Sequence, residues 1–159
     1  MPSTMEGKIM EDNSFGVVSL FLVFMAIAIA LGAVIPSAPL MGALYVLIVL
    51  LGFVLVLVSY CAKCPCRQGG CGHVLPGKLA KFLPKRKEGP YSLTDYTFTA
   101  VGIAAILLIP QLWLIRNIPA LLLFWGCSIV AALISYFLVC PDCPNKYCYL
   151  CGNRVKTKK

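Results

Sequence analysis

Charged residues are absent from most of this chain of 159 residues. None occurs in residues 15–60, 96–115 or 117–139, and the whole chain is 60% hydrophobic and only 13% charged. A water-soluble domain needs a charged surface, so this composition excludes an ordinary soluble globule. Pumps, proton relays and ion pathways usually carry ionisable groups inside the membrane, and the uncharged stretches offer none.

Histidine is almost absent as well. The single histidine, His73, lies outside the uncharged stretches, so a histidine ligand for haem inside the membrane is excluded. No pair of acid and base residues for a small-molecule substrate is evident, and the chain is therefore expected to be something other than an enzyme.

Four apolar segments are long enough to cross a membrane. A helix needs about 20 apolar residues to span a hydrocarbon core of roughly 30 Å. The four segments lie at residues 15–35, 40–60, 94–115 and 118–139. Backbone groups in lipid must pair within their own segment, so each is expected to be a helix. The sequence predicts an all-α membrane protein, a four-transmembrane-helix bundle that forms one domain over residues 1–159.

Basic residues are concentrated on one side of this predicted bundle. Twelve of the fourteen Lys and Arg residues lie in the cysteine-rich loop 61–93 and the cysteine-rich tail 140–159. Four spans place the termini, this loop and this tail on the same side, and the positive-inside rule makes that side cytoplasmic. We therefore expect an integral multi-pass membrane protein whose termini and cysteines face the cytoplasm.

Eight of the nine cysteines lie in two short runs that follow the second and fourth apolar segments. The first run contains Cys61, Cys64, Cys66 and Cys71, and the second contains Cys140, Cys143, Cys148 and Cys151. Both runs begin with C-x-x-C-P, and their first two cysteines are offset by 79 residues. This offset indicates a duplication into two tandem helical hairpins, each ending in a cytoplasmic cysteine knuckle.

The cysteine spacing predicts metal sites of the zinc type. One C-x-x-C turn supplies two thiolates, and two such turns complete a tetrahedral Zn²⁺ site. Because the duplication makes the helix ends equivalent, we expect one site formed by Cys61, Cys64, Cys140 and Cys143. The other four cysteines would form a second site, in which His73 could replace one of them. The competing arrangement is local, with each run holding its own ion.

Three other uses of the cysteines stay open. An iron–sulfur cluster is compatible with the gaps of the second run, which match those of ferredoxin loops in a different order. Disulfides are disfavoured, because the side predicted to carry the cysteines is the reducing one. Four-helix, quinone-linked thiol oxidoreductases also use C-x-x-C, but they use it on the non-cytoplasmic side.

The loop between the second and third spans contains a short basic amphipathic pattern that ends at Pro84. Its apolar face holds Leu75, Leu79, Phe82 and Leu83. Such a helix is typical of the headgroup layer, where each basic residue attracts anionic lipid by about 1 kcal/mol. The predicted lipid-binding residues are Lys78, Lys81, Lys85, Arg86 and Lys87. The alternative is a surface turn with solvated lysines.

Local patterns predict how the spans begin, bend and pack. Ser92-Leu-Thr-Asp95 matches a capping box for the third span, with Asp in place of Glu. Pro110 removes the amide that would bond to the carbonyl of Ile106, so a kink is expected there. Close helix contacts are expected at two small-residue patterns, Ala28-x3-Gly32 and Ser128-x3-Ala132, either within this bundle or with a partner helix.

These patterns together predict a small accessory subunit of a larger membrane protein complex, with zinc-type knuckles on its cytoplasmic face. A closed four-thiolate site has no open position for a substrate. The alternatives are an electron-transfer subunit with an iron–sulfur centre and a membrane thiol oxidoreductase. The expected partners are membrane lipids, anionic headgroups among them, and other subunits, with no nucleic acid and no small-molecule substrate.

Overall fold

The computed structural model describes residues 3–64, 74–84, 86, 89–142, 145, 147 and 148. Within these residues the chain forms helices and turns and contains no strand. Four helices are long and apolar enough to span a membrane, at Ser14–Val34, Pro39–Lys63, Leu93–Leu114 and Ile118–Val139. These bounds closely follow the four predicted spans and confirm an all-helical, multi-pass membrane protein.

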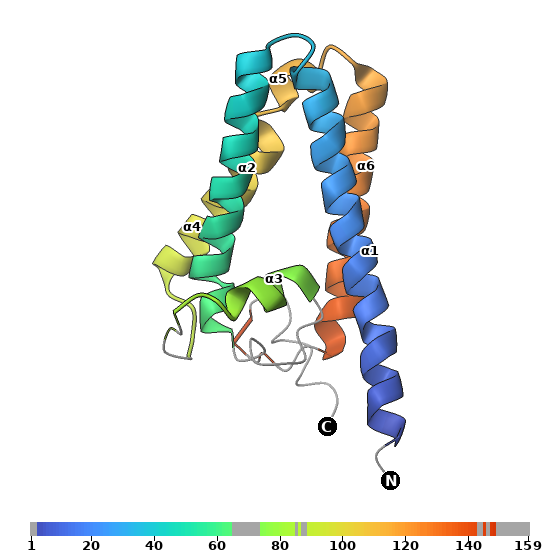
Figure 1. The fold of residues 1–159 in the computed structure, drawn as a ribbon, viewed down its shortest axis with the longest axis vertical. Coiled ribbons are helices and arrows are strands. Elements are labelled where there is room, and N and C mark those ends of the chain that lie inside the picture. Colours follow the sequence, from blue (N-terminus) through green and yellow to red (C-terminus); the bar gives the residue numbers. More distant parts are fainter. Residues whose placement is uncertain are drawn as a thin grey trace.

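The chain path brings the first cysteine of each run to one end of the molecule. Helices α1 (Ser3–Val34) and α2 (Pro39–Ser59) run in opposite directions, and α4 (Leu93–Leu108), the short α5 (Gln111–Leu114) and α6 (Ile118–Ile134) repeat this course. The start of α1 and the short helix α3 (Val74–Ala80) lie at the same end as Cys61 and Cys140 (Figure 1). We call this the cysteine end and the opposite one the turn end.

The two C-x-x-C motifs begin alike but follow different helix ends. A 3-10 turn starts at each first cysteine, in η1 (Cys61–Lys63) and in η4 (Cys140–Asp142). Helix α2 stays regular up to Ser59, whereas α6 passes into a wider π-helical turn, η3 (Ser135–Val139), before η4. The two halves therefore share the 3-10 turn at the first cysteine and differ in the turn that leads into it.

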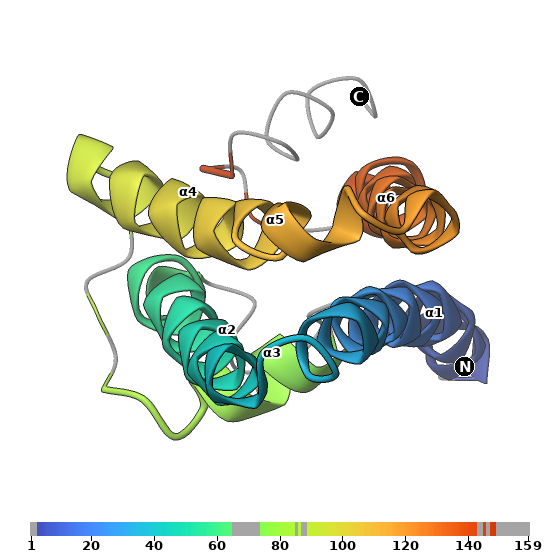
Figure 2. The same cartoon turned by 90° about the horizontal axis from the view of Figure 1, so that it is seen from above.

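Each long helix packs along a helix from the other half of the chain. Helix α1 lies against α6, and α2 lies against α4, whereas α1 and α2 contact each other far less. Figure 2 shows these two pairs side by side, and in Figure 1 they meet near the turn end and diverge toward the cysteine end. The tandem hairpins predicted from the sequence are therefore not the packing units, which are α1–α6 and α2–α4.

Two glycines let α2 and α4 approach closely. A Cβ on Gly52 would lie 2.9 Å from the carbonyl oxygen of Gly102, and a Cβ on Gly102 would lie equally close to that of Gly52. Residues without side chains are typical of such contacts between membrane helices. Gly32 makes no such contact within the bundle, because nothing outside its own helix lies within 4 Å of its Cβ position.

A buried hydroxyl joins α1 to α6. Ser19 Oγ donates to the carbonyl of Ala131 at 3.1 Å and shares a hydrogen bond of 2.8 Å with Ser135 Oγ. Ser135 is the first residue of the π-helical turn, and its backbone amide donates to the carbonyls of Ala131 and Ala132. Ser19 therefore stabilises the irregular end of α6 from the neighbouring helix.

Pro110 interrupts the third span as predicted, between α4 and α5. The carbonyl of Ile106, which a proline at this position leaves without its helical donor, accepts a hydrogen bond of 2.9 Å from Tyr45 Oη on α2. Tyr45 is fully buried. The partner helix therefore satisfies the backbone group that the kink exposes, as apolar surroundings require.

A second polar contact at the kink reaches α6. Gln111 Nε2 donates to the carbonyl of Leu107 at 2.6 Å, and Gln111 Oε1 accepts from Trp125 Nε1 at 3.2 Å. These two bonds satisfy the amide nitrogen and the amide oxygen of Gln111 inside an apolar span. They tie α5 to α6 near the turn end, where the two helix pairs meet.

Replacing Tyr45 tests the pairing at the kink. Tyr45→Phe should lower the stability of the bundle by about 1 kcal/mol, because the Ile106 carbonyl is left unpaired in the membrane. Unfolding by SDS in mixed micelles measures this loss. In a Pro110→Ala background the new amide can bond to Ile106, so the cost of Tyr45→Phe should fall toward zero. An equal loss of stability from Tyr45→Phe in both backgrounds would show that Tyr45 does not satisfy the Ile106 carbonyl.

Candidate functional site

The described cysteines of both runs meet around one tyrosine at the cysteine end. Cys140 and Cys148 are buried and pack with Tyr60, which directly precedes Cys61. The seven residues of this cluster, which we call the cysteine cap, are Tyr60, Cys61, Cys64, Tyr91, Cys140, Asn145 and Cys148. The cap therefore draws on the end of α2, the segment before α4 and the chain after α6.

Two hydrogen bonds reach sulfur atoms across the two runs. Tyr60 Oη is hydrogen-bonded to Cys148 Sγ at 2.9 Å, and Asn145 Nδ2 donates to Cys64 Sγ at 3.4 Å. Asn145 is also buried, and its Oδ1 accepts from the amide of Tyr147 at 3.1 Å. Hydrogen bonds of this kind orient cysteine side chains and tune their sulfur atoms. The tail is thus attached to the first run through sulfur contacts.

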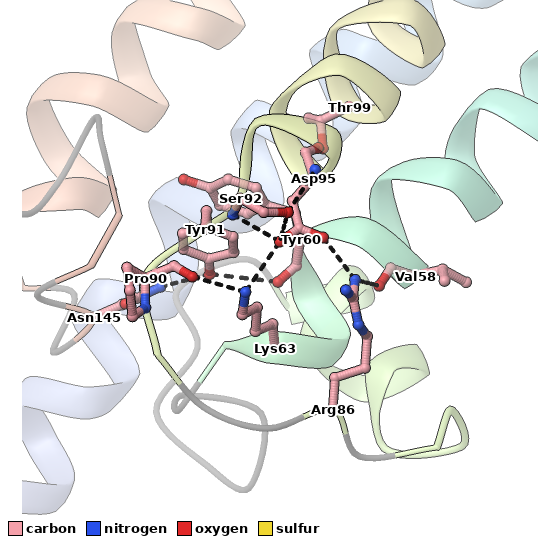
Figure 3. A network of polar contacts seen from close by, with 10 residues as sticks. All are labelled: Val58, Tyr60, Lys63, Arg86, Pro90, Tyr91, Ser92, Asp95, Thr99 and Asn145. Atoms are coloured by element: carbon pink, nitrogen blue, oxygen red, sulfur yellow. Dashed lines mark hydrogen bonds and ion pairs between the residues drawn. The ribbon is translucent and has the colours of Figure 1, made fainter.

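Stacked tyrosines connect this cluster to the loop before α4. The rings of Tyr60 and Tyr91 lie 4.2 Å apart with their planes 9° from parallel. Tyr91 Oη donates to the carbonyl of Tyr60 at 3.4 Å and accepts from Asn145 Nδ2 at 2.9 Å (Figure 3). Burial raises the pKa of Tyr91 well above its usual value, so its hydroxyl stays protonated and keeps its donor role near neutral pH.

Asp95, in the first turn of α4, lies at the centre of the adjoining polar network (Figure 3). Its carboxylate accepts from Lys63 Nζ at 3.0 Å and from Arg86 Nη1 at 2.7 Å. It also accepts from the amide and hydroxyl of Ser92, which confirms the predicted capping box. The carboxylate is 3% exposed, and the two cations and the cap donors together compensate the charge buried there.

The two cations of this network also bind backbone carbonyls. Lys63 Nζ donates to Pro90 at 2.7 Å, and Arg86 Nη1 donates to Val58 at 3.4 Å. Arg86 and Pro90 are thereby held against the end of α2. Sequence patterns identified only the local cap of Asp95, because nothing in them indicates that Lys63, 32 residues earlier, reaches the same carboxylate.

The predicted site residues are only partly brought together. Cys66, Cys71, His73, Cys143 and Cys151 lie outside the described residues. Within the described part, no group of three or more His, Cys, Asp or Glu residues is arranged to hold a metal ion. Cys140 is disulfide-bonded, and a disulfide sulfur is not a thiolate ligand. The described members of the predicted four-cysteine set, Cys61, Cys64 and Cys140, lie in the cysteine cap. Because Cys143 lies outside the described residues, the shared site of Cys61, Cys64, Cys140 and Cys143 stays a prediction.

The predicted lipid-binding residues also separate into groups. Lys78 and Lys81 are exposed, whereas Arg86 is 43% exposed and pairs with Asp95. Lys85 and Lys87 lie outside the described residues. The ninth cysteine, Cys127, packs against the apolar core of the bundle, as expected for a small residue in the fourth span.

Comparisons with protein-family models, with curated proteins and with solved structures gave no significant match to this chain. No relative therefore supplies an activity or a partner by likeness. What the protein does has to be inferred from the chemistry of the cysteine cap and the Asp95 network.

Replacing Asn145 tests whether the cap holds the tail. Asn145→Ala removes the donor to Cys64 and Tyr91, and two lost hydrogen bonds of about 1 kcal/mol each would raise the open population roughly 30-fold. Alkylation of Cys148, which is 7% exposed, should accelerate accordingly. The same substitution at Asn117, which caps α6 at the turn end, is the matched control. Unchanged labelling in Asn145→Ala would show that the tail is held elsewhere.

Replacing Asp95 tests the ionic network. Asp95→Asn leaves Lys63, a largely buried cation, without its counter-charge, and we expect a loss of about 3 kcal/mol in the free energy of unfolding. Trypsin should then cleave after Arg86 faster in intact, micelle-bound protein. Glu88→Gln makes the same change in charge within the same loop and serves as the control. Equal stability of the two variants would contradict a central role for Asp95.

Proposed function

We propose that this protein is a small accessory subunit of a larger membrane complex, and that its cysteine cap fastens the two helix pairs together at the cytoplasmic face. The observation that carries this proposal is the pair of sulfur contacts between the runs, Tyr60 to Cys148 and Asn145 to Cys64. Tyr60 follows the α2–α4 pair, and Cys148 and Asn145 follow the α1–α6 pair.

The divergence of the two pairs explains why such a fastening would be needed. The pairs meet near the turn end and separate toward the cysteine end. Hydrogen bonds of about 1 kcal/mol each hold the two helix pairs together only weakly at this end. Thiolate coordination of Zn²⁺ stabilises folded zinc knuckles by about 10–16 kcal/mol, so a thiolate-bound ion would close this end far more firmly. The concentration of cysteines at the divergent end supports a zinc-type site.

The surface of the spans supports an accessory rather than a catalytic role. Large apolar side chains are exposed on all four spans, among them Phe21, Leu47, Leu112 and Leu122. The polar groups described inside the spans, such as Ser19, Tyr45 and Gln111, are engaged in bonds between helices or at the kink. The spans therefore offer surface to lipid or neighbouring helices, and their polar side chains serve packing.

A second candidate, a membrane thiol oxidoreductase, is favoured by one observation. Cys140 is disulfide-bonded, and the Cys148 thiol packs in the same cluster. Attack of the Cys148 thiolate on that disulfide would form a new sulfur–sulfur bond and release the other sulfur as a thiolate. Net turnover would also need an external electron acceptor, such as a quinone.

Metal and thiol analysis of protein purified in mild detergent without oxygen separates these functions. The accessory role predicts stoichiometric zinc, no visible absorption and copurifying subunits. A brown colour with a reducible paramagnetic signal would identify an iron–sulfur electron-transfer subunit instead. Metal-free protein whose disulfide is re-formed by quinone would identify the oxidoreductase. An isolated monomer that turns over a small molecule would also overturn the accessory role.

Cysteine replacement tests how the two runs share an ion. The crossed site requires Cys140 as a reduced thiolate, so the test uses protein whose disulfide has been reduced. In that protein, Cys140→Ser with Cys143→Ser should release metal and make Cys61 and Cys64 reactive toward an alkylating reagent. Cys127→Ser, in the fourth span, is the matched control and should leave both metal and labelling unchanged. Continued protection of Cys61 and Cys64, with new reactivity at Cys148 and Cys151 alone, would show that each run binds its own ion.

A further inference from the structure

Helix α3 lies across the cysteine end of the bundle. It contacts α1, α2 and η1, and it runs transverse to the long helices (Figure 1). The second span ends at Lys63, the last residue of η1. An element that touches η1 therefore lies at the depth where the chain leaves the hydrocarbon core, which is the level of the lipid headgroups.

The face that α3 turns toward the bundle is made of its smallest residues. Gly77 and Ala80 are buried, whereas Leu75 and Leu79 are only partly buried. Phe82, in the turn that continues α3, is 88% exposed. Phe82 thus lies outside the protein core, so packing against the bundle does not account for it.

Positive charge lies beside this exposed apolar residue. Lys78 and Lys81 are both exposed within four residues of Phe82. Arg86 is also exposed, and its guanidinium binds Asp95 and the carbonyl of Val58. Apolar side chains flanked by lysine at headgroup depth are typical of an element that lies in the membrane interface.

We propose that α3 and Phe82 anchor the protein to anionic phospholipid of the leaflet at the cysteine end. The ring of Phe82 enters the boundary between headgroups and acyl chains, and Lys78 and Lys81 contact headgroup phosphates. The lipid leaflet fits this surface because it supplies an apolar layer and a negative layer at the same depth. This anchor is independent of the metal content of the cysteine cap.

The charge of this anchor can be tested with the full chain in nanodiscs that contain equal amounts of phosphatidylglycerol and phosphatidylcholine. Native mass spectrometry of the released protein measures the ratio of the two lipids that stay bound. We expect phosphatidylglycerol to be favoured, and each of Lys78→Gln and Lys81→Gln to lower the ratio by up to about fivefold, from about 1 kcal/mol per charge. Arg116→Gln, at the turn end, should leave the ratio unchanged.

The apolar part of the anchor is tested by hydrogen exchange over residues 74–84 in the same nanodiscs. Phe82→Ser should speed this exchange, whereas Leu93→Ser, which changes another exposed apolar residue at the same end, should not. Circular dichroism confirms that each variant is folded.

Three results would overturn the proposal. The first is equal binding of phosphatidylglycerol and phosphatidylcholine by the unmodified chain. The second is a preference for phosphatidylglycerol that is lost only when Lys85→Gln and Lys87→Gln are combined, and the third is a dimer of the chain that dissociates in Phe82→Ser. The second would assign lipid binding to the polybasic segment, and the third would assign the face to a second copy of this chain.

Discussion

A single carboxylate organises the end of the bundle at which the cysteines lie. Asp95 starts α4, and it binds Lys63 from the end of α2 and Arg86 from the loop between them. Leaving such a charge unpaired at the edge of the hydrocarbon would be costly, so these three segments are constrained to one arrangement. The stacked rings of Tyr60 and Tyr91 lie beside these three segments. Tyr91 in turn accepts a hydrogen bond from Asn145 of the tail.

Sequence patterns anticipated the features that depend on local chemistry. Uncharged stretches gave the four spans, Ser92 and Asp95 formed the expected capping box, and Pro110 broke the third span. Each of these follows from residues within one helix or at its first turn. The concentration of both cysteine runs at one end also follows from counting spans, because an even number returns the chain to the same side.

Tertiary pairing could not be anticipated in the same way. All four spans are apolar around their whole circumference, so hydropathy does not indicate which helix packs on which. The choice of α2–α4 depends on Gly52 and Gly102 meeting, and many other small residues in the spans would have suited a contact equally well. The π-helical turn before Cys140 could not be anticipated either, because its hydrogen bonds to Ser19 come from another helix.

The divergence of the two helix pairs makes the molecule a wedge. It is narrow where the outer turns meet and broad where α3 and the cysteine cap lie (Figure 1). A wedge displaces more lipid from one leaflet than from the other, so the area that it occupies differs between the two faces of the bilayer. Any contact that draws the broad end together then changes the lateral pressure on one side only. The packing of the cysteine end is in this way coupled to the curvature of the membrane around it.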